Sequence, residues 1–287
     1  MLTRLGLALM WLLHFLPPSV LAVFGEALGS FLYVFARERR QVATTNLRLC
    51  FPELPEYEIV NLVQRHFLSF GRSFLERGIL WWGSQARIMR LVRVEGIEHL
   101  QARTGQPLIL LTPHFVGLDM GWARLVCEHT LASTYSHQKN PVFDALLLKG
   151  RSRFGKPQLF SRQEGMRPAI KAITEGVPFY YLPDMDFGAR DSIFVPFFGV
   201  PAATITGLSR LARLTGAAVM PCVTRQLADG YAVKFYPAWD NFPGISVAED
   251  TRRMNLFIED RVREIPEQYF WLHKRFKTRP PGEPKVY

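Results

Sequence analysis

The sequence contains little cysteine, with three residues in a chain of 287 and no pair at C-x-x-C spacing. An odd number at these positions suggests neither a disulfide framework nor a thiolate zinc site. No internal repeat or low-complexity linker divides the chain. Its length is ample for one α/β core without disulfides, and a reducing compartment fits the cysteine usage.

Acidic residues are outnumbered by basic ones, 25 to 35, which gives a formal net charge of +10. Such a charge favours anionic partners: nucleic acid, an anionic membrane surface or an acidic carrier protein. No helix-turn-helix, zinc finger or stacking pattern of an RNA module is visible, so we expect no nucleic-acid partner. The 22 phenylalanines and six tryptophans instead suit a lipid interface.

Residues 5–36 are almost free of charge, since Glu26 is the one charged residue among them. A second apolar stretch follows Pro17 and Pro18, which is unlike a secretory signal peptide. We expect an uncleaved membrane segment that breaks at the two prolines. A single crossing helix, a hairpin or interfacial helix in the membrane, and a buried helical hairpin all remain open.

Positive charge follows this segment directly and favours a cytoplasmic location for what comes after it. The sequence thus predicts an N-terminal membrane anchor over 1–40 and a cytoplasmic domain over 41–287. The basic residues in question are Arg37, Arg39, Arg40 and Arg48.

Beyond a long helix that starts near Pro55, short apolar runs alternate with helical patterns. This alternation predicts βαβ units, and therefore an α/β fold with a mainly parallel central sheet flanked by helices. We expect strands at 106–112, 132–136, 177–183, 217–224 and 231–237, and helices at 117–129, 140–154, 166–176, 204–216 and 247–265.

The segment LILLTPHFVGLDM places His114 directly after a buried strand, with Asp119 five residues later. An imidazole suits the removal of a hydroxyl proton, and a carboxylate on its other nitrogen fixes the tautomer. On one helix, residues five apart point about 140° away from each other, so the pair meets only if the chain turns between them. Pro113 and Gly117 supply such a turn. The pattern is short, and a structural histidine is the alternative.

Two further groups of polar residues lie downstream. The first is a basic cluster suited to phosphate or carboxylate, or alternatively a solvated helix face; it consists of Lys139, Lys149, Arg151, Arg153, Lys156 and Arg162. The second is Asp184 and Asp186, which follow a strand and can face one site. These carboxylates can hold a metal, orient the basic cluster or close a turn with Gly188, and a metal is the least favoured because no histidine lies nearby in the sequence.

Several motifs together resemble the lipid A biosynthesis acyltransferases of lauroyl or myristoyl type, within the glycerophosphate and lysophospholipid acyltransferase superfamily. The resemblance covers nearly the whole chain. It is carried by NLRLCFPEL, HFVGLD, QKNPVFD, GRSRFG, LPDMDFG, SIFVPFFGVPAATITG and above all PEQYFWLHKRFKTRPPGE at 266–283. Met185 departs from the pattern, because relatives often carry a polar or basic residue there.

The resemblance implies an inner-membrane enzyme of a Gram-negative bacterium, with its catalytic domain on the cytoplasmic face. It implies transfer of a fatty acyl chain from acyl carrier protein to a hydroxyl of a lipid A precursor of the Kdo2-lipid IVA type, without a metal or other cofactor. His114 would be the general base and Asp119 its orienting partner. The residues expected to shape the acceptor or phosphate site are Asn140, Arg151, Arg153, Arg162, Asp184 and Asp186.

Two rival functions remain open at this stage. The same dyad would serve a lysophospholipid or another glycolipid acceptor, because only the pocket differs. The net charge alone would also fit a membrane-associated binding protein for acidic lipid or nucleic acid, in which His114 is structural.

Overall fold

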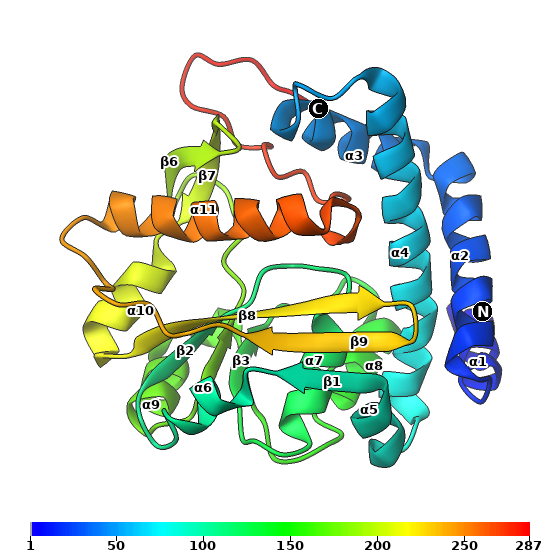
Figure 1. Cartoon of the computed structure of the whole chain (residues 1–287), viewed down its shortest axis with the longest axis horizontal. Coiled ribbons are helices and arrows are strands. Elements are labelled where there is room, and N and C mark those ends of the chain that lie inside the picture. The colour runs from blue at the N-terminus through cyan, green and yellow to red at the C-terminus, as the bar shows by residue number, and fades with distance from the viewer. Residues whose placement is uncertain (1) are drawn as a thin grey trace.

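The computed structural model describes residues 2–287 and contains a seven-stranded sheet in the order β1-β9-β8-β2-β5-β3-β4 (Figure 1). Neighbouring strands are parallel except β8 and β9, which form an antiparallel hairpin. A separate antiparallel pair consists of β6 and β7. The strands are β1 (Val92–Glu95), β2 (Leu108–Leu111), β3 (Ala132–Tyr135), β4 (Gln158–Ser161), β5 (Phe179–Tyr181), β6 (Ser192–Phe197), β7 (Val200–Ile205), β8 (Ala218–Leu227) and β9 (Gly230–Phe235). The predicted α/β fold with a mainly parallel sheet is confirmed.

Helices flank the sheet, and their starts follow the local sequence. Asn140 caps α8 by accepting hydrogen bonds from the N–H groups of Val142 and Phe143, and Pro141 occupies the first turn. The helices are α1 (Leu2–Leu13), α2 (Pro18–Phe35), α3 (Arg37–Cys50), α4 (Glu56–Trp82), α5 (Gln85–Leu91), α6 (Ile97–Gln101), α7 (Leu118–Val126), α8 (Pro141–Arg151), α9 (Arg167–Thr174), α10 (Gly207–Thr215) and α11 (Val247–Glu264), with short 3₁₀ turns at η1 (Arg162–Glu164) and η2 (Pro266–Gln268).

The core lies on both faces of the sheet, and β2 shows how the sequence produces this. All four residues of β2 are fully buried, and alternate side chains point to opposite faces. Ile109 and Leu111 contact the apolar cluster beneath α11, whereas Leu108 and Leu110 contact the cluster around α7. A strand covered on both faces needs a continuous apolar run, which is the pattern of LILL.

The N-terminal segment breaks at Pro17 and Pro18, as expected, because α1 ends at Leu13 and α2 begins at Pro18. Helix α2 runs beside α4 at the edge of the molecule (Figure 1). The contact is close because Gly25 and Gly29 of α2 face Gly71 of α4, where an added Cβ would overlap the opposite backbone. Backbones approach this closely only where side chains are absent.

The outer face of α1 and α2 is apolar and exposed. Helix α2 has a mean hydropathy of 1.5 and is long enough to cross a membrane, with 22% of its residues buried. This exposure argues against the buried helical hairpin, because a buried hairpin hides its large apolar side chains. The exposed apolar residues are Leu5, Leu9, Trp11, Leu12, Phe15, Val20, Val23, Phe24, Phe31, Val34 and Phe35. The division into an anchor over 1–40 and a domain over 41–287 stays a prediction.

Candidate active site

His114 lies at the carboxyl ends of the central strands, in the loop between β2 and α7. Ligands bind at this edge in open α/β sheets. Thr112 ties the neighbouring strand ends together, because its N–H and its hydroxyl both donate to the Tyr181 carbonyl at 2.9 Å. A cavity of about 620 Å³ opens here, and His114 lines it. This volume is within the range of roughly 300–1,000 Å³ found for small-molecule sites.

Asp184, which follows β5, holds the His114 imidazole. The carboxylate accepts from the His114 backbone N–H through Oδ2 at 2.8 Å, and its Oδ1 lies 2.6 Å from Nδ1 of the ring. Asp184 is 1% exposed, whereas the His114 side chain is 22% exposed and faces the cavity. With Nδ1 on the carboxylate, Nε2 is the ring nitrogen available to a substrate.

The charge state of Asp184 follows from this contact. Burial alone would raise the pKa of the carboxyl, but the His114 charge and the two hydrogen bonds outweigh burial and lower the pKa. The carboxylate is therefore ionised near neutral pH and stabilises a protonated imidazole.

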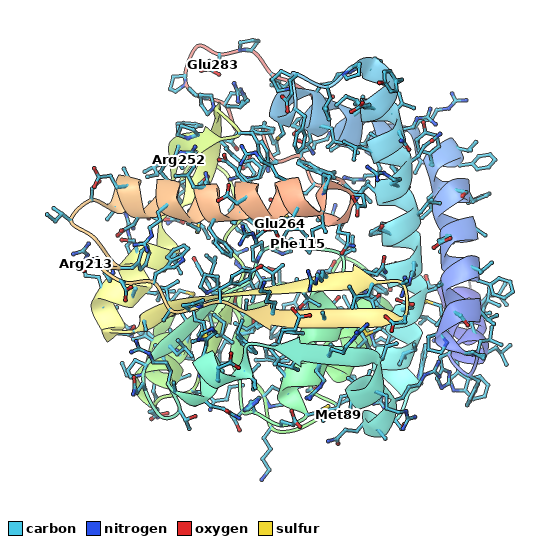
Figure 2. All side chains as sticks on the ribbon, in the orientation of Figure 1. Met89, Phe115, Arg213, Arg252, Glu264 and Glu283 are labelled. Atoms are coloured by element: carbon cyan, nitrogen blue, oxygen red, sulfur yellow. The ribbon has the colours of Figure 1, made fainter. Side chains whose placement is uncertain are left out.

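The C-terminal segment 266–283 holds the loop that carries His114. The His114 carbonyl accepts from Phe270 N–H, and Val116 N–H donates to the Gln268 carbonyl, both at 2.9 Å. Phe115 forms a β-bridge with Tyr269 and lies between α11 and the sheet (Figure 2). The C-terminal segment 266–283 thus supports the loop through its backbone.

The expected pairing of His114 with Asp119 is wrong. Asp119 lies in the first turn of α7, and its two oxygens accept from other partners: Arg77 Nε donates to Oδ2 at 3.1 Å, and an Arg151 Nη donates to Oδ1 at 3.0 Å. Burial would raise the pKa of Asp119, but the guanidinium groups of Arg151 and Arg77 outweigh burial and lower it. The turn at Pro113 and Gly117 directs the two side chains to different partners, although both line the cavity.

Of the other predicted site residues, Arg151 and Arg162 line the cavity. Asn140 caps α8 and its amide donates to the Thr3 hydroxyl, so it serves the helix start. Arg153 donates to the carbonyls of Leu80 and Gly83 at 2.8 Å and thereby joins α8 to the end of α4. Asn140 and Arg153 therefore have structural contacts and do not line the cavity, and their role in the acceptor site stays a prediction.

Asp186 closes a turn and anchors the C-terminal segment 266–283. Its carboxylate accepts from Gly188 N–H at 2.9 Å and from the N–H and hydroxyl of Thr278 at 2.7 and 2.8 Å. Its own N–H donates to Nε2 of His273 at 2.9 Å. Of the roles left open from the sequence, the turn with Gly188 is the one that the structure supports.

Both polar and apolar side chains line the cavity. The polar lining residues include His114, Asp119 and Arg151, with hydroxyl and amide side chains from the end of β3 and beyond. The apolar lining residues include Leu159, Met166, Ile170, Leu182, Leu211 and Leu214, most of them from β4, α9 and α10. One cavity can therefore receive both a hydrocarbon chain and a polar reacting group.

Three cavity or supporting residues were missed from the sequence. Arg77 lies on α4, 42 residues before its partner Asp119, and no local motif marks it. Tyr181 and Arg210 look like ordinary strand and helix residues until the fold turns them toward the cavity.

The comparisons with known proteins agree over the whole chain. The family model described as bacterial lipid A biosynthesis acyltransferase matches residues 1–278. Three Escherichia coli (strain K12) proteins are similar: the lipid A biosynthesis lauroyltransferase at 37% identity over 100% of this chain and 94% of its own, the palmitoleoyltransferase at 32% over 100% and 94%, and the myristoyltransferase at 32% over 99% and 89%.

Proposed function

This chain belongs to the bacterial lipid A biosynthesis acyltransferase family, and from that premise we propose that it moves a fatty acyl chain from acyl carrier protein to a hydroxyl of a Kdo2-lipid IVA-type precursor. An O-acyltransferase acting in lipid A biosynthesis is the coarser statement that family membership supports. The observation that carries the finer proposal is the His114 and Asp184 pair at a cavity lined by both polar and apolar side chains.

In the proposed reaction, Nε2 of His114 removes the proton of the acceptor hydroxyl as its oxygen attacks the thioester carbonyl carbon. Asp184 holds the ring in the tautomer with Nε2 free and stabilises the imidazolium that forms. A carbon–oxygen bond forms and the carbon–sulfur bond breaks, and the imidazolium proton passes to the leaving thiolate. The products are an ester and the free carrier thiol, so the step needs no metal or other cofactor.

Asp119 is a positioning residue in this scheme. Its ion pairs with Arg77 and Arg151 fix the Arg151 guanidinium at the cavity wall. A fixed guanidinium there would attract the anionic parts of the two substrates and stabilise negative charge that develops during transfer.

The partners follow from charge and from the exposed apolar face. A net charge of +10 favours an acidic carrier protein and a phosphorylated glycolipid. The apolar face of α1 and α2 would lie in the membrane, with the arginines at the start of α3 on the cytoplasmic side. We place the enzyme at the inner membrane of a Gram-negative bacterium, with its catalytic domain on the cytoplasmic face.

The test is acyl transfer by the purified full-length chain in detergent. Acyl carrier proteins charged with different chains are mixed with a tetra-acylated lipid A precursor or with a lysophospholipid, and product is measured by mass spectrometry. His114→Ala should lower the rate about 10²- to 10⁴-fold, because a general base contributes that much. His99→Ala on α6 is the matched control.

Three outcomes would contradict the proposal. A rate for His114→Ala within tenfold of wild type would show that His114 is not the general base. Faster acylation of the lysophospholipid favours the alternative acceptor. Salt-dependent lipid binding without turnover of any thioester favours a binding protein.

A further inference from the structure

Helix α10 begins at the wall of the cavity. Thr206 and Gly207 at its start both line the cavity, and Thr206 makes no side-chain capping hydrogen bond. The first N–H groups of a helix have no partner within the helix and carry partial positive charge. They therefore form half of an anion-binding arrangement, which needs further donors to become a site.

The Tyr181 hydroxyl is the second donor. Tyr181 is 8% exposed, yet it lines the cavity, and a Cβ added at Gly207 would overlap its hydroxyl oxygen. Among the described parts of residues 2–287, no hydrogen bond to this hydroxyl is formed. The hydroxyl is directed at the start of α10 in the cavity lining, so a bound ligand can supply its hydrogen-bond partner. Burial raises the pKa of Tyr181, so the group remains a protonated donor near neutral pH.

Two guanidinium groups complete the arrangement. Arg162 lies over the Phe187 ring at 4.0 Å from its centroid, and its charge partly offsets the effect of burial on the pKa of Tyr181. Arg210 extends from the first turn of α10 and is exposed at the cavity wall. Asp191 also lines the cavity and opposes an anion there.

We propose that Tyr181, the start of α10 at Gly207, Arg162 and Arg210 form a phosphate-binding subsite beside the general base. Every one of these groups is a donor, which suits the oxygen atoms of a phosphate ester. The Thr112 hydrogen bonds to the Tyr181 carbonyl join the subsite to the loop of His114. The inference rests on the proposed function, whose two substrates each supply a phosphate: the acceptor glycolipid and the pantetheine arm of the carrier.

Binding tests the subsite without turnover. Ligand-observed NMR of the full-length chain in detergent compares glucosamine 1-phosphate with glucosamine. Wild type should bind the phosphate ester more tightly, and Tyr181→Phe and Arg210→Gln should each weaken its binding about tenfold to a hundredfold, because each removes a hydrogen bond to a charged group. Asp191→Asn should tighten binding.

Arg167→Gln is the matched control, because Arg167 is an exposed arginine on α9 outside the cavity lining. It should bind like wild type. Equal binding of glucosamine and its phosphate, or wild-type affinity in both Tyr181→Phe and Arg210→Gln, would overturn the proposal. If wild type binds the phosphate ester but transfers no acyl chain, the proposed function fails and the subsite stands.

Steady-state kinetics then identify the source of the phosphate. If the acceptor supplies it, Tyr181→Phe should raise KM for the bisphosphorylated precursor about tenfold or more, with kcat little changed, and should not affect a dephosphorylated precursor. If the carrier arm supplies it, the rise should appear with acyl carrier protein and be absent with acyl-pantetheine, which lacks the phosphate. A KM within twofold of wild type for all four substrates would refute the subsite.

Discussion

Asp184 accepts two hydrogen bonds from one residue, His114, whose backbone N–H and ring Nδ1 reach separate oxygens of the same carboxylate. The two residues are 70 positions apart in the chain and lie on adjacent strand ends. The contact fixes both the place of the loop and the rotation of the ring. It also leaves Asp119 available for Arg77 and Arg151.

Replacing Asp184 should lower kcat more than replacing Asp119. Asp184→Asn should lower kcat about 10²- to 10⁴-fold, because the amide no longer stabilises the imidazolium or fixes its tautomer. The ¹⁵N resonances of His114 should report a changed tautomer balance in Asp184→Asn and little change in Asp119→Asn. Surface Asp229→Asn is the control. A larger decrease in kcat for Asp119→Asn than for Asp184→Asn would show that Asp119 orients the ring.

Asp119 should contribute to stability in a pH-dependent way. Asp119→Asn leaves two guanidinium groups without a counter-charge. We expect this to lower the free energy of unfolding by about 1–3 kcal/mol at pH 7. Because the folded-state pKa of Asp119 is lowered from 3.8, this contribution is complete above that pH and falls as the pH drops below it. Urea unfolding of wild type and variant between pH 2.5 and 8 would show it, with the gap between them narrowing below about pH 4. A gap that widens in acid contradicts the assignment.

His66 and His273 should make the fold sensitive to acid. Burial is the main reason that the pKa of each ring falls from 6.5 to about 4. Between these pH values the unfolded chain binds protons that the folded chain does not, so stability should fall as the pH drops from 6.5 to 4, by about 3 kcal/mol per ring at most. His66→Gln and His273→Gln should each flatten this dependence. An unchanged slope in both buried variants would contradict the prediction.

The glycine contact between α2 and α4 should be intolerant of a single methyl group. Gly71→Ala would place Cβ against the backbone at Gly25 and Gly29. We expect this to lower the free energy of unfolding by about 1–3 kcal/mol and to speed proteolysis of the N-terminal segment. Gly6→Ala on α1 is the matched control, because nothing lies within 4 Å of its Cβ position. Thermal unfolding and limited trypsin digestion in detergent measure both effects. Equal behaviour of the two variants would show that the helices do not depend on this contact.

Much of the fold follows from local pattern. The apolar run LILL and the aromatic run around Tyr180 predicted two central strands, and the helical spacing after Pro55 predicted α4. The sequence pattern did not reveal β4, because Gln158–Ser161 is short and only partly apolar. It also missed β1, where Arg93 and Glu95 alternate with valines at the edge of the sheet.

The sequence by itself determined that His114 follows a buried strand, that residues 5–36 are apolar and broken at two prolines, and that helices alternate with strands. These features depend on neighbours within a few residues, where period and turn chemistry act. Only the tertiary structure decided which carboxylate holds the imidazole, because the carboxyl ends of parallel β2 and β5 meet at one edge of the sheet. Asp184 arrives there from a distant part of the chain, while α7 turns the nearer Asp119 toward arginines of α4 and α8.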